Sequence, residues 1–223
     1  MSVRPIYIAD CDQDKFVSSK DIEFQWHPGF SVSQKQKSIK SFHESAYRQY
    51  DFSNILEIST KSPTPIGVKC SAFNLMLEIN GIKSSVESFY QGSKLFRKGG
   101  PYTDLYEMKS IVSKKDKRIK ESGELIGFSL FDVNWDLNDN FYSYLYILAL
   151  KQNPSLANAL QEYEAFTDIE FNPKKSFNCQ AYSAALFIAA IKSNINLDCL
   201  DCKDSFIESF PSKKLLNFQS NLF

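Results

Sequence analysis

The chain has 223 residues, of which 43% are hydrophobic and 14% aromatic, enough apolar side chain for one sizeable core. Its 26 basic and 26 acidic residues leave no formal net charge, which excludes a global field that would draw the protein to nucleic acid or to an anionic membrane. The amino terminus has no secretory apolar segment, and the longest apolar-leaning run, residues 179–191, is shorter than the ~20 residues of a membrane span.

The five cysteines are an odd number, which favours a reducing compartment over a disulfide framework, so we expect a cytoplasmic protein. Cys199 and Cys202 form a CxxC pair, but His27 and His43, the only histidines, lie far away in the sequence. Because zinc needs further ligands, the pair is interpreted as two free thiols. No metal or cofactor is expected.

The pattern of apolar, capping and breaking residues predicts an α+β fold, since strands and helices alternate without a regular strand–helix–strand rhythm. In chain order we expect a strand at 4–9, a helix at 33–50, strands at 55–59 and 68–79, a turn at Asn80-Gly81, a helix at 84–98, a helix at 113–121, a strand at 124–131, helices at 139–151 and 154–163, a strand at 166–171 and a helix at 178–192. The tail after Asn194, which contains Pro211, is expected to be loosely packed.

The expected helix at 84–98 carries the most informative stripe of polar residues. At 100° per residue, Glu87, Gln91 and Lys94 share one face, and apolar residues occupy the opposite arc. Two interpretations are open. Ser84 and Glu87 fit a capping box, which would leave the stripe an ordinary solvated surface, and the pattern alone favours this. The other interpretation is an active site.

The order of motifs around this helix resembles that of the NADAR family, whose fold is also called YbiA-like. The segments that carry the resemblance are Ser71-Ala-Phe-Asn-Leu75, Val86-Glu-Ser-Phe-Tyr-Gln-Gly-Ser-Lys94, Trp135, Gln152-Asn-Pro-Ser-Leu156, the acidic strand end at Asp168 and Glu170, and the helix that opens at Asn178. They cover about residues 68–190. Two further runs, 99–105 and 172–176, resemble the NADAR antitoxins that are paired with DarT-type toxins.

The resemblance implies a NADAR-like domain, mostly helical around a small mixed sheet. We expect the catalytic domain at 66–195, an amino-terminal extension at 1–65 packed on it, and a tail at 196–223. This chain departs from the family after its acidic strand. It has Glu170-Phe-Asn-Pro-Lys-Lys175 where the family has an Asp and a Trp-Gly pair, so that pocket wall does not carry over.

The implied activity is removal of ADP-ribose from guanine bases of DNA, which reverses the modification made by a DarT-like toxin. Lys94 matches the family lysine for which a Schiff-base-like attack has been proposed, and Glu87 matches the family acid. A nucleophilic lysine must be partly neutral, for which an aromatic wall and the neighbouring Lys98 are the expected causes. The remaining substrate contacts expected in this chain are Gln91, Ser71, Phe73, Asn74, Tyr102, Trp135, Asp168, Glu170 and Gln180.

Several of these residues have plainer interpretations. Trp135 or Tyr102 would stack on a ring of the ligand, but Trp135 also suits a core or rim. Asp168 and Glu170 would point to one side of the strand, either into a pocket or at an exposed edge, and Asn178 suits a helix cap.

The basic run at 109–120 is either a solvated helix face or a DNA-contacting patch made by Lys114, Lys115 and Lys117. Two rival functions also remain. One is an N-glycosidase acting on a small metabolite of the riboflavin-pathway type. The other is a non-catalytic antitoxin that binds its toxin.

Overall fold

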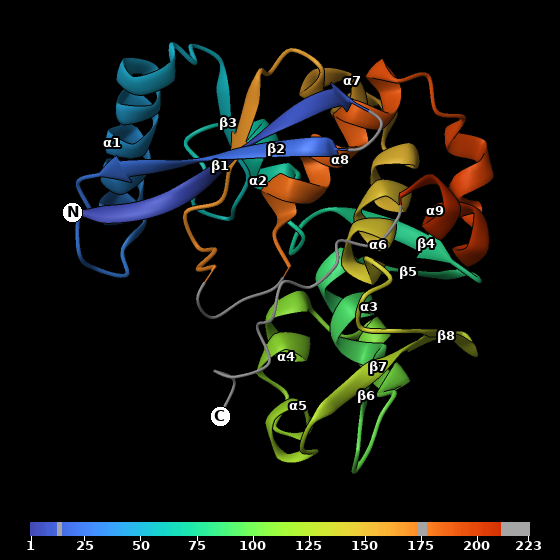
Figure 1. Cartoon of the computed structure of the whole chain (residues 1–223). Coiled ribbons are helices and arrows are strands. Elements are labelled where there is room, and N and C mark those ends of the chain that lie inside the picture. Colours follow the sequence, from blue (N-terminus) through green and yellow to red (C-terminus); the bar gives the residue numbers. More distant parts are fainter. Residues whose placement is uncertain (13–14, 174–177, 211–223) are drawn as a thin grey trace. The chain divides into compact units, whose positions relative to one another are not determined.

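The computed structural model describes residues 1–12, 15–173 and 178–210, and Figure 1 labels its helices and strands. The chain divides into two compact units. The first unit comprises Met1–Ser71 and Asn153–Ile195, and the second comprises Ala72–Gln152 and Asn196–Phe223. The mixture of helices with small sheets confirms the expected α+β class. The division into an extension, a catalytic domain and a tail stays a prediction.

The first unit contains a mixed four-stranded sheet with the order β2-β1-β9-β3. Its strands are β1 (Ser2–Asp12), β2 (Lys15–Phe24), β9 (Ala165–Thr167) and β3 (Ile55–Glu57). Strand β1 runs antiparallel to β2 and β9, whereas β3 runs parallel to β9. Strand β2 was not predicted, although Ile22 and Phe24 are buried on either side of the exposed Glu23, an alternation typical of a strand.

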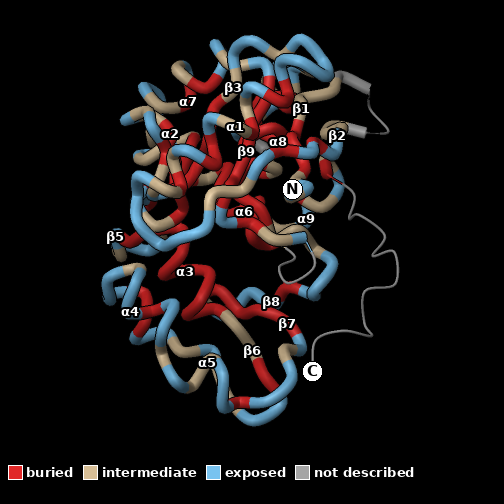
Figure 2. The backbone as a smooth tube through the Cα atoms, turned by 90° about the vertical axis from the view of Figure 1, so that its left-hand side faces the viewer, coloured by how far each residue is buried: buried red, intermediate tan, exposed pale blue. Residues whose placement is uncertain are grey.

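The helices of the first unit are α1 (Val32–Tyr50), α2 (Pro65–Lys69), α7 (Pro154–Leu160) and α8 (Gln180–Lys192). Helix α1 buries Ile39, Phe42 and Ala46 in one apolar cluster with residues of β1 and β2. The rings of Phe24 and Phe42 stack with centroids 4.7 Å apart. Helix α8 is apolar almost all round and is drawn largely in the colour of buried residues in Figure 2. The expected helices at 33–50 and 178–192 are therefore confirmed, with the second beginning at Gln180. The expectation that Asn178 caps this helix is wrong, because its N-cap is Cys179.

The second unit contains the hairpin of β4 (Met76–Ile79) and β5 (Ile82–Ser85) and a sheet of β6 (Lys94–Phe96), β7 (Leu125–Leu130) and β8 (Val133–Trp135). Its helices are α3 (Val86–Gly92), η1 (Thr103–Glu107), α4 (Ser110–Lys115), α5 (Arg118–Glu121), α6 (Phe141–Lys151), η2 (Leu197–Asp201) and α9 (Lys203–Ser209). The predicted turn is confirmed, because Asn80 and Gly81 join β4 to β5 with positive φ angles of 50° and 78°.

The strand expected at 68–79 and the helix expected at 113–121 are both wrong in part. The segment expected as a strand at 68–79 begins inside α2, because Thr64 caps that helix and Pro65 opens it, and only its last residues form β4. The expected helix at 113–121 is broken at Asp116. The Asp116 carboxylate accepts the backbone N–H of Arg118 at 2.9 Å, a local bond that competes with continuing the helix.

The expected loose packing after Asn194 is wrong for residues 197–210. Phe206 is fully buried, and its ring lies 6.2 Å from that of Trp135 and 5.3 Å from that of Tyr144. The end of this segment is therefore part of the second unit's aromatic core. Pro211 and the residues after it lie outside the described part of the chain.

The described cysteine side chains of Cys70, Cys179 and Cys202 are free thiols, whereas the Cys199 side chain lies outside the described residues. Over the described ranges, no helix has both the length and the apolar character needed to cross a lipid bilayer.

Candidate active site

The helix expected at 84–98 is wrong in its second half. Helix α3 ends at Gly92, and Lys94 is the first residue of β6, where it pairs with Phe128 of β7. The last residue of the helix packs against the Tyr106 ring, and it must be glycine because a Cβ added at Gly92 would lie only 2.6 Å from that ring. At the other end Ser85, not Ser84, is the N-cap, and its side chain accepts the backbone N–H of Ser88. The capping interpretation of the polar stripe is therefore wrong.

Glu87 and Gln91 nevertheless lie together, and both are buried. The Glu87 side chain is 5% exposed, and its Oε1 accepts a hydrogen bond from Gln91 Nε2 at 3.0 Å. Oε1 of Gln91 has no hydrogen-bond partner among the described residues. Because buried acceptors are normally paired, an unpaired oxygen at this position is unusual. The stripe is not the solvated surface that the pattern alone favoured.

Lys94 lies next to this pair although it belongs to a strand. Its ammonium is 4.8 Å from the centroid of the Tyr90 ring, so the expected aromatic wall is present. Burial lowers the pKa of Lys94 to about 8; the charge of Glu87 opposes this effect, and the charge of Lys114 adds to it. A substantial fraction of Lys94 is therefore neutral amine near physiological pH.

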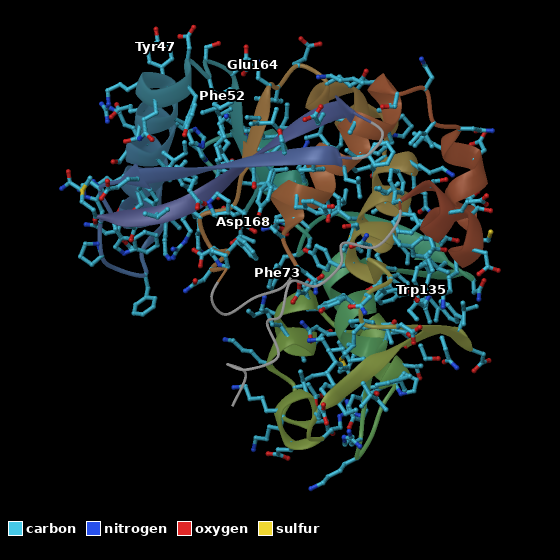
Figure 3. The ribbon with its side chains drawn as sticks, viewed as in Figure 1. Tyr47, Phe52, Phe73, Trp135, Glu164 and Asp168 are labelled. Carbon is cyan, nitrogen blue, oxygen red and sulfur yellow. The ribbon has the colours of Figure 1, made fainter. Side chains whose placement is uncertain are left out.

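The cation that acts on Lys94 is not the one predicted. Lys98 is exposed, and its backbone N–H donates to the carbonyl of Ser122. Lys114 instead places its Nζ 3.3 Å from Glu87 Oε1 and 4.8 Å from the Phe73 ring centroid. Phe73 is labelled in Figure 3. Lys114 belongs to the candidate site, whereas the sequence offered a solvated helix face or a DNA-contacting patch for it.

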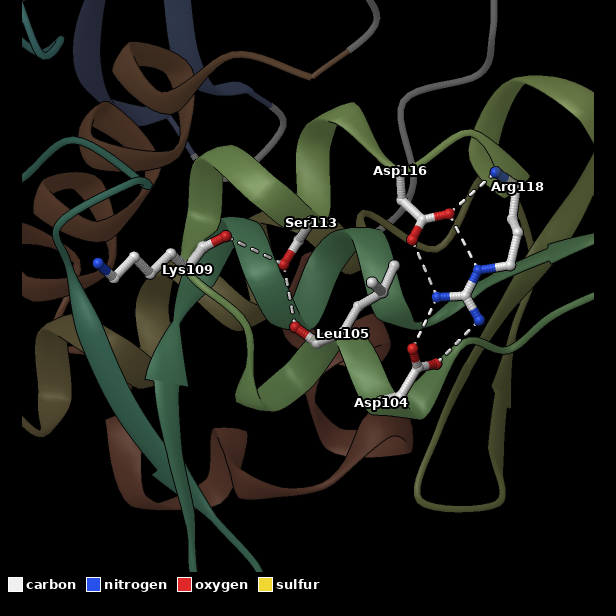
Figure 4. Close-up of polar contacts among 6 residues, drawn as sticks. All are labelled: Asp104, Leu105, Lys109, Ser113, Asp116 and Arg118. Atoms are coloured by element: carbon white, nitrogen blue, oxygen red, sulfur yellow. Dashed lines mark hydrogen bonds and ion pairs between the residues drawn. The ribbon is translucent and has the colours of Figure 1, made fainter.

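The rest of the basic run divides into neutralised and exposed residues. Arg118 pairs with Asp104 at 2.6 Å and with Asp116 at 2.9 Å, as Figure 4 shows. Lys115 and Lys117 are exposed to solvent. The part of the run that remains suited to phosphate contacts is therefore smaller than the sequence indicated.

Other residues expected at the substrate have defined places in the fold. The Tyr102 hydroxyl bonds to Ser122, and the Arg118 guanidinium lies 4.5 Å from the centroid of the Tyr102 ring. Trp135 is 3% exposed, with its ring 4.5 Å from that of Tyr144 (Figure 3).

The segment before α3 supplies the remaining residues of this set. Phe73 is partly buried and Asn74 is exposed. Ser71 is buried and is the last residue of the first unit's amino-terminal segment. The ligand contacts of these residues stay predictions.

The first unit holds a separate cluster of acids. Strand β9 ends at Thr167, so the expectation that Asp168 and Glu170 alternate along a strand is wrong. Asp168 Oδ1 accepts the backbone N–H groups of Glu170 and Phe171 at 3.0 and 3.2 Å, which closes a turn. Asp168 is buried, whereas Glu170 is largely exposed and pairs with Lys35 at 3.2 Å.

Glu57, a residue that the sequence did not single out, anchors the turn at Asp168. Its carboxylate accepts the Thr167 hydroxyl at 2.7 Å and the backbone N–H of Ile169 at 2.9 Å. His43 Nε2 lies 2.9 Å from the same hydroxyl. The available signal was a carboxylate inside the apolar run Ile55-Leu-Glu-Ile58, because an acid there is buried at a cost and needs partners.

Burial raises the pKa of Glu57 despite these bonds. Burial, with the nearby charge of Glu57, also raises the pKa of Asp168 to about 8, and a hydrogen bond to Gln180 opposes the shift. Asp168, Glu170 and Gln180 all belong to the first unit. The prediction that they share a pocket with Glu87 and Lys94 stays a prediction.

A pH-dependent stability is expected from Asp168. Its pKa of about 8 in the folded state lies above the ordinary value of 3.8. Between these pH values the folded state keeps a proton that the unfolded state releases, so the free energy of unfolding falls as pH rises. Asp168→Asn removes this contribution. Urea denaturation should therefore show the variant gaining about 1–3 kcal/mol relative to wild type between pH 5 and pH 8.

His43 changes the stability with pH in the opposite direction, and it does so in both the wild type and the Asp168→Asn variant. Burial lowers its pKa to about 4, so stability falls as pH drops below its ordinary value of 6.5. Taking the difference between variant and wild type removes this contribution. A difference that stays constant between pH 5 and pH 8 would contradict a raised pKa at Asp168.

Across residues 1–12, 15–173 and 178–210, no three His, Cys, Asp or Glu side chains are grouped so that they could hold a metal ion. A family model described as DarT1-associated NADAR antitoxin matches residues 2–220. No curated protein matches the chain.

Proposed function

This chain belongs to the family of DarT1-associated NADAR antitoxins, and on that premise we propose that it removes ADP-ribose from guanine bases of DNA. In this role it is the antitoxin to a DarT-like ADP-ribosyltransferase. The observation that supports the proposal best is Lys94, a partly buried lysine whose pKa is lowered to about 8 next to the buried carboxylate of Glu87. A lysine of this kind is suited to covalent catalysis.

The reaction breaks the bond between the anomeric carbon of the ribose and the guanine nitrogen. Positive charge develops at that carbon, and the base must leave with a proton. In the proposed mechanism the neutral amine of Lys94 attacks the anomeric carbon while the bond to guanine breaks. Opening of the ribose ring then yields an imine, which water hydrolyses to return the amine and release ADP-ribose.

Glu87 is placed to move the proton in this scheme. When the amine of Lys94 attacks, it becomes positively charged and must lose a proton. The Glu87 carboxylate takes that proton and passes it to the departing base, which retains for Glu87 the acid role implied by the family. The unpaired Oε1 of Gln91 is suited to accept a hydrogen bond from a hydroxyl group of the ribose.

The proposal is tested on a purified oligonucleotide that carries ADP-ribose on guanine. We expect the protein to release free ADP-ribose and leave unmodified guanine, both measured by mass spectrometry. Toxin neutralisation without any release would favour the non-catalytic antitoxin. Release from a small N-glycoside but not from the oligonucleotide would favour the metabolite N-glycosidase.

Lys115 and Lys117 provide a test of the nucleic-acid substrate. If they contact phosphates, replacing both with alanine should lower kcat/KM on modified DNA by about tenfold near 0.1 M salt and flatten its salt dependence. Activity on an ADP-ribosylated guanosine nucleoside should not change. Lys83→Ala, which alters an exposed lysine of β5, is the matched control. An equal loss on DNA and nucleoside would contradict a DNA-contacting patch.

A further inference from the structure

Serine side chains, three of them buried and that of Ser110 partly buried, join α4 to α3. Oγ of Ser110 lies 2.9 Å from Oγ of Ser85, and Oγ of Ser113 lies 3.3 Å from Oγ of Ser88. The Ser88 hydroxyl also donates to the carbonyl of Met108 at 2.9 Å, just before α4. Hydroxyl pairs of this kind hold two helices in one register, because breaking them would leave buried polar groups unpaired.

Ser113 is the centre of this serine seam (Ser85, Ser88, Ser110 and Ser113). It is fully buried, and its Oγ also lies 3.0 Å from the carbonyl oxygen of Leu105 and 3.4 Å from that of Lys109, the two contacts drawn in Figure 4. Lys114 is the next residue along α4. The seam therefore fixes the part of α4 from which the Lys114 side chain extends.

Lys114, which follows Ser113 in α4, forms an ion pair with Glu87 of α3. The Lys114 side chain is 52% exposed, and its Nζ is 3.3 Å from Oε1 of the 5% exposed Glu87. The Phe73 ring lies under the ammonium, and the Phe73 carbonyl accepts the Ser110 hydroxyl at 2.6 Å. Removing one partner of such a pair leaves the more buried charge without compensation.

The charge of Lys114 also lowers the pKa of Lys94. Among the described residues, the charged groups that act on the Lys94 amine are Glu87 from α3 and Lys114 from α4. Strand β7 contributes Phe128 opposite it, and α3 places the Tyr90 ring against it, neither of which carries charge. The two charged neighbours have opposite effects, since Glu87 favours the protonated amine and Lys114 disfavours it.

We propose that Lys114 is a positioning residue of the reaction, which holds the Glu87 carboxylate in place and keeps Lys94 in its reactive form. The inference rests on the proposed function. It assigns Lys114 to the active site, whereas the sequence indicated that this lysine could contact DNA. The serine seam holds α4, which carries Lys114, against α3, which carries Glu87.

The test compares Lys114→Met with Lys114→Arg, using ADP-ribosylated guanosine so that DNA affinity does not enter. We expect Lys114→Met to lower kcat about tenfold. Without the neighbouring ammonium, the pKa of Lys94 rises, so the pH of half-maximal rate should move up by about half to one pH unit. Lys114→Arg keeps the positive charge and should restore most of both values. Lys83→Met is the matched control and should match wild type.

Thermal unfolding of each variant separates a folding defect from a catalytic one. Because Lys114 is half exposed, we expect Lys114→Met to fold, and Lys114→Gln, which keeps a polar side chain, is the second variant. Loss of kcat with an unchanged pH profile and no rescue by arginine would overturn the proposal, as would unchanged kinetics. If wild type itself releases no ADP-ribose, the proposed function fails instead.

Discussion

Lys94→Ala is expected to reduce the rate of ADP-ribose release by about 100- to 10,000-fold, because it removes the attacking amine. Lys94→Arg should be equally impaired, since a guanidinium stays protonated and cannot attack. Release from a modified oligonucleotide under single-turnover conditions measures both. Circular dichroism and thermal unfolding provide the control that both variants fold.

Two further measurements address how Lys94 acts. A hydride reductant added during turnover should trap an imine as a stable adduct, located by mass spectrometry on the peptide that contains Lys94. The wild-type rate should rise with pH, reach half its maximum near pH 8 and level off above that pH, as the amine of Lys94 loses its proton. A fully active Lys94→Ala variant would remove both the mechanism and the assignment of the site.

Glu87→Gln is expected to lower kcat by about 100-fold, because the amide keeps the shape of the side chain but cannot carry the proton. The change also removes the negative charge that favours protonated Lys94. The pKa of Lys94 should therefore fall further, and the pH of half-maximal rate should move down. The pH–rate profile of the variant on ADP-ribosylated guanosine measures both effects.

The direction of this shift distinguishes Glu87 from Lys114. Loss of Glu87 should move the profile to lower pH, and loss of Lys114 should move it to higher pH, because their charges act on Lys94 with opposite sign. A shift in the same direction for both variants would show that general loosening of the site, and not charge, controls the amine. Near wild-type kcat in Glu87→Gln would exclude Glu87 as the group that moves the proton.

Much of the local structure could be predicted because its causes lie within a few residues of each other. The Asn80-Gly81 turn follows from the tolerance of both residues for positive φ. Helix α1 follows from apolar residues at helical spacing after a serine start, which was expected at Ser33 whereas Ser31 is the N-cap. The order of the motifs around Glu87 and Lys94 was also enough to indicate the family, whose model matches residues 2–220.

The site itself depended on contacts between distant segments. Helix α3 ends at Gly92, which packs against the distant Tyr106 ring, and Lys94 lies in a strand, where helical periodicity no longer applies. The serine seam between α3 and α4 made Lys114 the partner of Glu87, a pairing that the charge pattern of one segment cannot reveal.

The sequence by itself therefore determined the α+β class, the Asn80-Gly81 turn, and the pair of residues on which the reaction is proposed to depend. Only the tertiary structure decided that Glu87 and Gln91 are buried, which cation acts on Lys94, and that Glu57 anchors the Asp168 turn. The physical reason is that turns and caps arise from neighbouring residues. Burial and the pKa of a side chain are set by whatever the rest of the chain packs against it.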